Sequence, residues 1–403
     1  MKTILTTTDP QRLGSLKQHF EAVFGQMPQR IFSAPGRTEI CGNHTDHQRG
    51  RVLAAAVNLD ALAAVSENNT TLLRVQSEGY PMYQVELSDL SIHKDEENTT
   101  PALIRGVAAR FHEMGCPLRG LDIYVTSQVL PGSGLSSSAA FEVLIGTVLN
   151  GLFFDEKATP AQIAQIAQYA ENVYFGKPSG LMDQMASSVG NLVEIDFSDA
   201  EHPVITPLDF DFSATGYALC IIDSRASHAD LTDEYAAIPN EMCAVADYFG
   251  KEVLSQVPED AFYAALPALR KQCGDRAVLR AVHFYQENQR VTEACLALRH
   301  GDFDRFLSVI QQSGSSSYMY LQNVSPAGAI DQQSMAITLA LCQHYLDGTG
   351  AYRVHGGGFA GTCQAFVPMD KLEAFRAGID GALGQGACHV LSIRPQGGAE
   401  VEA

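Results

Sequence analysis

The sequence predicts a mixed α/β protein built from two domains, and three observations lead to that expectation. The chain has 403 residues, whereas a single hydrophobic core stops growing at about 250–300 residues. Apolar runs of strand length alternate along the chain with segments whose apolar residues recur at helical spacing. Glycine-rich loops connect several of these segments. We place the domain boundary near residue 208, which gives domains over 1–208 and 209–403.

Composition points to a protein that works on small molecules. An apolar share of 46% with 18% charged residues is typical of a globular protein. The net charge of −19 argues against nucleic-acid and membrane-surface roles, because it repels phosphate backbones and anionic lipid. The nine cysteines are scattered without a C-x-x-C pair, which favours neither a disulfide framework nor a zinc site and suits a reducing cytosol. No apolar stretch approaches the roughly 18 residues of a membrane span. We therefore expect a cytoplasmic protein, with a monomer favoured and the oligomeric state left open.

The first elements frame a polar stretch at residues 36–50. They are predicted, in order, as a helix over 9–25, a short strand over 31–34, and strands over 52–57 and 61–65. The polar stretch places Arg37, His44, Asp46 and His47 between glycines, which let the backbone approach a ligand. An Asx-rich turn between two strands is the alternative. A metal cluster of the histidines with Asp46 is disfavoured, because adjacent positions on an extended segment point to opposite faces.

The following segment begins weakly patterned and ends with clear elements. Residues 71–97 alternate weakly, and the acidic run 95–97 is expected to be a solvated loop. A helix is predicted from Thr100, the expected N-cap, to its stop at Gly115. A half-buried strand over 121–126 follows, because apolar and polar residues alternate there.

A glycine and serine loop spans residues 130–140 and enters a helix over 141–149. A strand, a glycine loop and a helix N-terminus direct free N–H groups and the helix dipole onto one spot, where an anion is stabilised. The loop is neither a Walker A loop nor a G-x-G-x-x-G fingerprint, because Gly-Lys-Ser/Thr is absent and Ser137 replaces the third glycine. Its serines can cap the helix, bond phosphate oxygens or bind magnesium. A simple helix-capping turn is the alternative.

The remaining elements carry an acid at a helix start and a third glycine loop. Glu171 lies on a helix predicted over 159–176, and Asp183 opens the next helix, where an acid is most often a cap or first-turn charge. The third glycine loop covers 355–361, and its His355 is expected to be a packed or capping residue. Other predicted elements are strands over 192–197 and 217–222, a loop over 200–211, helices between 233 and 310, and a serine-rich turn over 313–317.

Together these features resemble the GHMP small-molecule kinases, and most closely the galactokinases. The resemblance covers essentially the whole chain, in order and spacing as well as in residue type. Its carriers are Pro35-Gly36-Arg37 through His44-Thr45-Asp46, the loop from Gly132 to Ala140, the segment from Gly180 to Gln184, and the loop from Gly356 to Gly361. The resemblance implies an α+β protein with an N-terminal α/β domain, like the second domain of ribosomal protein S5, and a ferredoxin-like C-terminal α/β domain. ATP and a sugar are expected to meet in the cleft between them.

The resemblance also implies a role for each matching residue. Asp183 takes the position of the catalytic base, and Arg37 that of the residue that stabilises charge beside it. Ser138 and Glu171 match the ligands of Mg²⁺, and ATP is the expected co-substrate. The sugar contacts correspond to Arg37, Asn43, His44, Asp46, Gly180, Asp183 and Tyr235. The loop that holds the ATP phosphates corresponds to Gly132, Ser133, Gly134, Leu135, Ser136, Ser137 and Ser138.

These roles agree with the chemistry of phosphoryl transfer, in which a protein mainly positions the reactants and neutralises charge. A carboxylate at Asp183 would accept the proton of an anomeric hydroxyl, and a nearby Arg37 would keep that carboxylate ionised. Asp46 can accept two hydrogen bonds from neighbouring sugar hydroxyls, which lets a site reject an epimer. The resemblance to the galactokinases implies that the product is galactose 1-phosphate.

The chain departs from the galactokinase pattern at three places. The family usually has Glu at the position of Asn43, Tyr at the position of His47, and an Asn-Arg-Arg-like pattern at residues 236–239. Because the Glu reaches the hydroxymethyl end of galactose, Asn43 is expected to tolerate a C6 carboxylate as well. A galacturonokinase is therefore the leading alternative, and similar plant galacturonate kinases also lack the Glu and carry Asp-His-Gln after it. A non-catalytic sugar sensor is disfavoured, because Glu171, Asp183 and the loop serines are all present.

Overall fold

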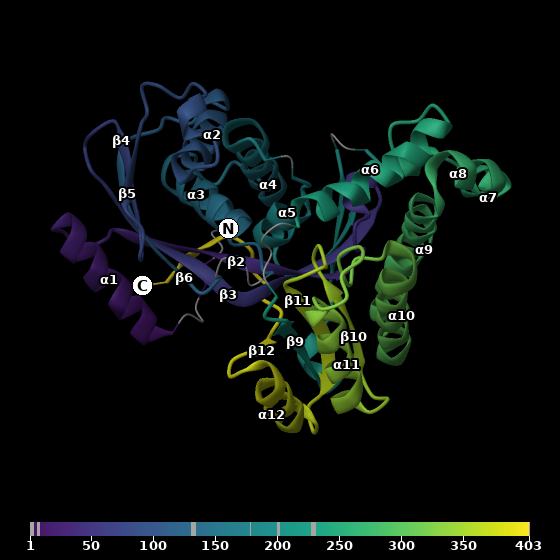
Figure 1. Ribbon diagram of the computed structural model, residues 1–403. Coiled ribbons are helices and arrows are strands. Elements are labelled where there is room, and N and C mark those ends of the chain that lie inside the picture. Colours follow the sequence, from purple (N-terminus) through teal and green to yellow (C-terminus); the bar gives the residue numbers. More distant parts are fainter. Residues whose placement is uncertain are drawn as a thin grey trace.

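A computed structural model describes residues 4–5, 9–129, 134–177, 179–199, 202–226 and 231–402. Two β-sheets form the framework of this part of the chain, and helices pack on them (Figure 1). The first sheet has the order β1-β13-β2-β3-β6-β4-β5, and β7 pairs with β3 and β8. Its strands are β1 (Ile4–Leu5), β2 (Arg30–Cys41), β3 (Arg51–Glu67), β4 (Leu72–Ser77), β5 (Met82–Glu86), β6 (Leu121–Ser127), β7 (Leu192–Asp196), β8 (Val204–Leu208) and β13 (Ala399–Val401).

Helices bury both faces of the first sheet. On one face, Phe20 of α1 meets Ile31 and Leu62. The other face, which carries Phe32, is covered by the group α2 to α5 (Figure 1). Strand β6 was predicted to be half-buried, but residues 121–125 are buried on both faces for this reason. The helices are α1 (Pro10–Phe24), α2 (Thr100–Glu113), α3 (Ser137–Phe153), α4 (Pro160–Tyr169) and α5 (Met182–Val189).

The second sheet is antiparallel, with the order β10-β11-β9-β12. Helices α9 and α10 share a core with one of its faces, and α11 and α12 share a core with the other. Helices α6 to α8 pack beside α9 around a core of their own. Among the described residues, no helix is both long and apolar enough to cross a membrane. These elements are β9 (Tyr217–Asp223), α6 (Thr232–Tyr248), α7 (Glu259–Ala264), α8 (Leu266–Cys273), α9 (Asp275–Arg299), α10 (Phe303–Ser316), α11 (Ser334–Leu346), β10 (Ala351–His355), β11 (Thr362–Pro368), α12 (Leu372–Leu383) and β12 (Cys388–Leu391).

Long strands tie the two halves of the molecule together. Strands β2 and β3 run from the first sheet toward the second half (Figure 1), where Ile40 and Leu53 share a core with Leu219 and Ile310. The last strand, β13, returns to the first sheet and pairs with β2. A domain boundary at residue 208 stays a proposal. The second sheet begins after it, at β9, but the segment 209–403 also supplies β13 to the first sheet.

Strand pairing overrides the local sequence pattern at several places. Strand β2 does not end at residue 34 but runs through Cys41, so the polar stretch begins as extended backbone. The two apolar runs after that stretch form the single strand β3. Segment 71–97 contains β4 and β5, and the described part of the predicted loop 200–211 contains β8. Strand β4 is held by β6, a partner distant in sequence, and a local pattern does not reveal such pairing. Strands β5 and β8 pair with the preceding strands β4 and β7.

Two polar runs that were predicted to be loops are structured. Residues 313–316 continue α10, because the buried Ser313 donates a hydrogen bond to Glu287 (2.5 Å). In the acidic run, Glu96 forms a bidentate pair with Arg105 at 2.6 and 2.8 Å. Helix α2 also begins one residue earlier than expected, with Thr99 at the N-cap.

Candidate active site

A buried arginine and a carboxylate form the centre of the candidate site. Arg37 lies on β2, and Asp183 lies in the first turn of α5. The guanidinium Nε and Nη2 donate to the two Asp183 oxygens at 2.6 and 2.8 Å, and the Ser136 hydroxyl donates to Oδ2 at 2.6 Å. Burial alone would raise the pKa of Asp183, but the charge and hydrogen bonds of Arg37, helped by Ser136, outweigh it and lower that pKa. The structure thus brings together the predicted base and the predicted charge-stabilising residue, with Asp183 ionised.

The second glycine loop lies against this pair. The Arg37 N–H donates to the Leu135 carbonyl at 3.0 Å, and the Arg37 side chain also donates to the Gly134 carbonyl. Gly134 has a φ of +75°, and a Cβ there would lie 2.4 Å from the Thr362 hydroxyl of β11. Glycine therefore allows the loop to sit between β2 and the second sheet. The predicted phosphate contacts Gly132 and Ser133 lie outside the described residues.

A hollow of about 280 Å³ opens where this loop faces the third glycine loop. Its lining includes Arg37, residues 136–138, Lys177 and residues 356–358. Helix α3 begins at the hollow, and the first turn of a helix has N–H groups without intrahelical partners. Its N-cap residue, Ser136, uses its hydroxyl on Asp183. The loop and the start of α3 can therefore stabilise an anion in this hollow.

A second hollow, of about 450 Å³, adjoins the same serines. It is lined by Ser137 and Ser138 and by apolar and aromatic side chains, among them Tyr80, Phe141 and Phe175. The two hollows thus share the start of α3. An elongated ligand with a charged end and a flat apolar end can span them.

A cluster of oxygen atoms surrounds Glu171 beside the first hollow. Glu171 lies in η3 (Ala170–Phe175), a π-helical turn that continues α4. Its Oε1 is 3.4 Å from the Ser138 hydroxyl and 2.8 Å from Lys177 Nζ, whereas its Oε2 accepts from Ser179 (2.6 Å) and Gln184 (2.8 Å). Hydroxyl and carboxylate oxygens suit Mg²⁺. No group of three or more acids, histidines or cysteines in the described chain is arranged for a metal, so phosphate and water oxygens would have to complete the shell.

Asp46 and Gly180 meet near Asp183. Asp46 begins η1 (Asp46–Gln48), and a Cβ on Gly180 would lie 2.3 Å from its Oδ2. Burial raises the pKa of Asp46 to about 6, and the nearby charges of Asp183 and Glu39 act in the same direction. The structure therefore brings these two predicted sugar contacts together. The raised pKa places the ionisation of Asp46 close to neutral pH.

The other predicted sugar contacts hold the third glycine loop. The Asn43 amide donates to the Gly356 carbonyl at 2.7 Å, and the Tyr235 hydroxyl donates to the Gly358 carbonyl at 2.9 Å. Between them, His44 Nε2 lies 3.1 Å from the Gly357 carbonyl. The three consecutive carbonyls of this loop are thus bound by two residues that follow β2 and by one residue of α6. His44 and Tyr235 remain partly exposed, but Asn43 is completely buried.

The Asn43 side chain is saturated by protein groups. Its amide also faces both Glu39 oxygens, at 3.2 and 3.4 Å, and its Oδ1 accepts from Asn323 at 2.8 Å. Glu39 is itself buried and paired with Arg353 at 2.6 Å. A direct contact between Asn43 and a sugar stays a prediction, and in this arrangement it would require the glycine loop to move.

His355, which was predicted to be a packed or capping residue, and His47 are both held by neighbouring side chains. His355 is buried, with Nδ1 at 2.8 Å from the Thr362 hydroxyl and Nε2 at 3.1 Å from that of Thr38. His47 Nε2 lies 3.3 Å from His44 Nδ1, and burial lowers the pKa of His47 to about 3. Both histidines are neutral at physiological pH, which suits a structural role.

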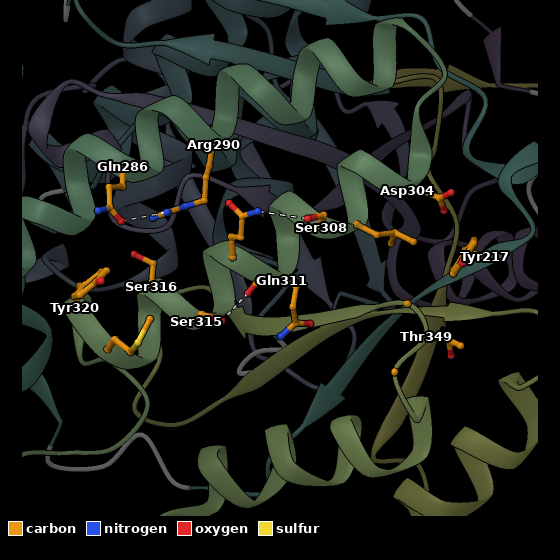
Figure 2. A pocket seen from close by; sticks show the side chains of 15 residues that line it. Tyr217, Gln286, Arg290, Asp304, Ser308, Gln311, Ser315, Ser316, Tyr320 and Thr349 are labelled. Atoms are coloured by element: carbon orange, nitrogen blue, oxygen red, sulfur yellow. Dashed lines mark hydrogen bonds between the residues drawn. The ribbon is translucent and has the colours of Figure 1, made fainter.

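Helix α9 packs against the polar stretch and binds its backbone. Glu287 accepts hydrogen bonds from the N–H groups of Gly42 (3.1 Å) and Asn43 (3.4 Å), and it pairs with Arg290 at 2.7 Å. Figure 2 shows Arg290 beside Gln286 at the wall of a third hollow, of about 740 Å³, between α9, α10 and the turn before β10. None of the described residues that line this hollow is a predicted site residue. Two chains of contacts join it to the candidate site: Arg290 pairs with Glu287, and Ser316 bonds His283, which bonds the Asn43 carbonyl.

Sequence reasoning missed Lys177, Glu39, Arg353 and Glu287. Lys177 stands in the short segment between Glu171 and Asp183, and that position was the available signal. The other three lie far from one another in the sequence, on β2, β10 and α9, and become neighbours because β10 and α9 pack against β2 and the polar stretch.

Comparisons with known proteins agree with this geometry. Residues 102–191 match the family of GHMP kinases N terminal domains, and residues 18–67 match the galactokinase galactose-binding signature. The chain is 30% identical to the galactokinase of Streptomyces coelicolor over 391 residues, which cover 96% of this chain and 97% of the relative. It is 32% identical to the galactokinase of Glaesserella parasuis over 365 residues, which cover 89% and 90% of the two chains.

Solved structures show the same fold. The galactokinase of Lactococcus lactis in complex with galactose superposes with a TM-score of 0.81 at 23% identity, covering 96% of this chain and 99% of that one. The mevalonate kinase of Methanococcus jannaschii gives a TM-score of 0.63 at 13% identity, covering 90% and 98%. The α+β fold and the two-part architecture implied by the sequence are thus those of the GHMP kinases.

Proposed function

This chain belongs to the galactokinase family of the GHMP kinases, and we propose that it transfers the γ-phosphoryl group of ATP to the anomeric hydroxyl of galactose. The observation that carries the proposal is the bidentate pair of Arg37 and Asp183. Arg37 lines the hollow beside the α3 serines, and Asp183 is close enough to Asp46, which Gly180 approaches, for its charge to raise the pKa of Asp46. A phosphate donor on one side and a sugar on the other would therefore meet at Asp183.

Asp183 is proposed as the base that accepts the hydroxyl proton as the oxygen attacks the phosphoryl group. The hydrogen bonds from Arg37 and Ser136 hold its carboxylate ionised and fixed in direction. The Arg37 charge also lies beside the position where negative charge develops during transfer, where a fixed cation stabilises the transition state. The anomeric oxygen gains a bond to phosphorus, the bond from phosphorus to the β-phosphate oxygen breaks, and ADP leaves.

ATP is proposed to span the two hollows that share the start of α3. Its phosphates would lie on the N–H groups of the loop and of α3, where a helix N-terminus favours anions. The base would enter the apolar hollow that includes Tyr80, Phe141 and Phe175. Ser138 and Glu171 are proposed to hold Mg²⁺, which supplies charge neutralisation on the phosphates when it is bound.

Asp46 is proposed as the main acceptor for sugar hydroxyls, with Gly180 leaving room for the ring and His44 and Tyr235 at the border. The galacturonate alternative rested on the loss of a negative charge at Asn43. A carboxylate nevertheless lies 3.2 Å from the Asn43 amide, because Glu39 occupies that space. Galactose is therefore the better supported substrate.

The test of the base is Asp183→Asn. We expect turnover to fall by about 10² to 10⁴-fold, which is the range for a missing general base, while ATP binding stays within about threefold of the original because no phosphate contact is removed. Asp275→Asn is the matched control, since Asp275 is an exposed partner of Arg270. Near-native turnover of Asp183→Asn would contradict the base assignment.

The test of the substrate is a panel of galactose, galacturonate, N-acetylgalactosamine and arabinose, with ATP and Mg²⁺. We expect galactose to have the highest kcat/KM and phosphorus NMR to locate the phosphate on the anomeric oxygen. A higher kcat/KM for galacturonate would replace the proposal by a galacturonokinase. Phosphate on any other oxygen would overturn the proposed reaction.

A further inference from the structure

Lys177 is a cation at the phosphate hollow that no sequence motif singles out. Its Nζ lies 2.8 Å from Glu171 Oε1, and its side chain keeps 57% of its surface exposed. It lines the 280 Å³ hollow together with Arg37 and the serines 136–138. We propose that Lys177 binds the phosphates of the nucleotide directly, leaving Glu171 when the nucleotide enters. The inference rests on the proposed function for the identity of that nucleotide.

The charges of the hollow make Lys177 the cation that can turn to a ligand. Of the described residues that line the hollow, Arg37 and Lys177 carry a permanent positive charge at neutral pH. Arg37 is already committed, because its Nε and Nη2 bind Asp183 and its Nη1 binds the Gly134 carbonyl. Lys177 has Glu171 as its ion-pair partner in the described part of the chain, and its flexible side chain is half-exposed. A triphosphate entering a protein of net charge −19 needs such a local cation.

Glu171 can lose Lys177 without being left unpaired. Its Oε2 keeps the hydrogen bonds from Ser179 and Gln184. Its Oε1, which Lys177 occupies, is the oxygen that the Ser138 hydroxyl also approaches, at 3.4 Å. The ammonium therefore stands beside the two oxygens proposed for Mg²⁺. Movement of Lys177 to the phosphates would free those oxygens for the metal, so that nucleotide and metal binding support each other.

The backbone fixes where the ammonium starts from. Gly176 has a φ of +86°, and a Cβ there would lie 2.6 Å from Glu97 Oε1. The Lys177 N–H then donates to the Glu171 carbonyl at 3.1 Å. This tight turn brings the lysine back over the carboxylate that lies six residues earlier. The glycine is thus the feature that directs Lys177 into the hollow.

The test is a double-mutant cycle of Lys177→Met and Glu171→Gln, read by the binding of ATP in EDTA by calorimetry. The readout needs neither metal nor turnover. If Lys177 contacts phosphate, Lys177→Met weakens ATP binding by about tenfold or more in both backgrounds, as expected for a lost charged hydrogen bond. If Lys177 only neutralises Glu171, the substitution has no effect once Glu171 is already Gln, and that result would overturn the proposal.

Two controls keep the cycle interpretable. Lys157→Met removes the same charge from an exposed site at the far end of α3, and ATP binding should not change. Lys177→Arg keeps a cation and should restore binding to within about threefold of the original. Thermal unfolding of every variant checks the fold. Because the cycle measures ATP binding, it stays decisive even if wild-type turnover of the sugar panel shows that the acceptor is not galactose.

Discussion

Asp46 illustrates how burial of a single residue sets both affinity and stability. Its carboxylate is expected to accept hydrogen bonds from the sugar, and the ionised form accepts them more strongly than the neutral form. Burial and the nearby charges of Asp183 and Glu39 raise its pKa to about 6. The group is therefore largely ionised at pH 8 and largely neutral at pH 5.

The equilibrium dissociation constant for galactose is predicted to rise by up to about tenfold between pH 7 and pH 5, because about one tenth of Asp46 is ionised one unit below its pKa. Calorimetric titration with galactose across this range measures the effect. In Asp46→Asn the inflection near pH 6 should disappear. A wild-type constant that is flat from pH 5 to pH 8 would contradict the assignment.

The same pKa has the opposite consequence for folding. An acid whose folded pKa lies above its unfolded value favours folding below the unfolded pKa, and this contribution is lost as the pH rises through the folded pKa. Asp46→Asn should therefore raise the unfolding temperature at pH 8, with little change near pH 4. Binding and stability thus impose opposite demands on this residue.

At the residue scale, the sequence was sufficient where a residue acts through its own chemistry within a recognisable motif. Arg37 and Asp183 lie 146 positions apart in the sequence, yet the motifs shared with the galactokinases predicted that their side chains lie close together. Asn43 shows where that reasoning ends. Its identity was visible, but its burial against Glu39 and Asn323 depends on parts of the chain whose approach no motif encodes.

At the element scale, helices were predicted better than strands. The capping box formed by Thr159 and Gln162 starts α4, and Gly25 in the left-handed conformation ends α1. These signals are local, so the sequence contains them completely. Strand β4 depends on β6, which lies in another segment of the chain. The serine-rich run 313–317 is helical because its hydroxyls form hydrogen bonds with the buried Glu287 and His283 of α9.

The close approach of two elements, η1 and the turn before α5, gives a further prediction. Gly180→Ala would place a Cβ 2.3 Å from Asp46 Oδ2, a distance that forces the carboxylate or the turn to move. We expect the KM for galactose to rise by about tenfold or more, as for a lost hydrogen bond to a charged group, while the KM for ATP changes little. Steady-state kinetics in both substrates measures the difference.

Gly14→Ala is the matched control for this substitution, because a Cβ at Gly14 in α1 meets no atom within 4 Å. Its kinetic constants should equal those of the original chain. An unchanged galactose KM in Gly180→Ala would mean that the contact between η1 and this turn does not shape the sugar site.

At the scale of the whole molecule, the chain is more interwoven than a division into two successive domains suggests. Strands β2 and β3 belong to the first sheet and also contribute Ile40 and Leu53 to the core shared with α10 and β9. The last strand crosses back to pair with β2. Length predicted two cores, but neither length nor composition encodes a returning strand, which is specified by contacts nearly 370 residues apart.

The returning strand predicts that the C-terminus stabilises the first sheet. Ala399 and Val401 are buried beside α1, and Glu400 forms a bidentate pair with Arg30 at 2.6 and 2.7 Å. A chain ending at residue 398 loses these contacts and exposes the edge of β2. We expect its free energy of unfolding to fall by about 3 kcal/mol, mainly from the lost apolar burial. Urea unfolding followed by circular dichroism measures the change as a shift of the midpoint. A chain that ends after Val401 keeps the strand and should unfold like the full chain, whereas equal midpoints for all three chains would show that β13 adds nothing to the stability of the sheet.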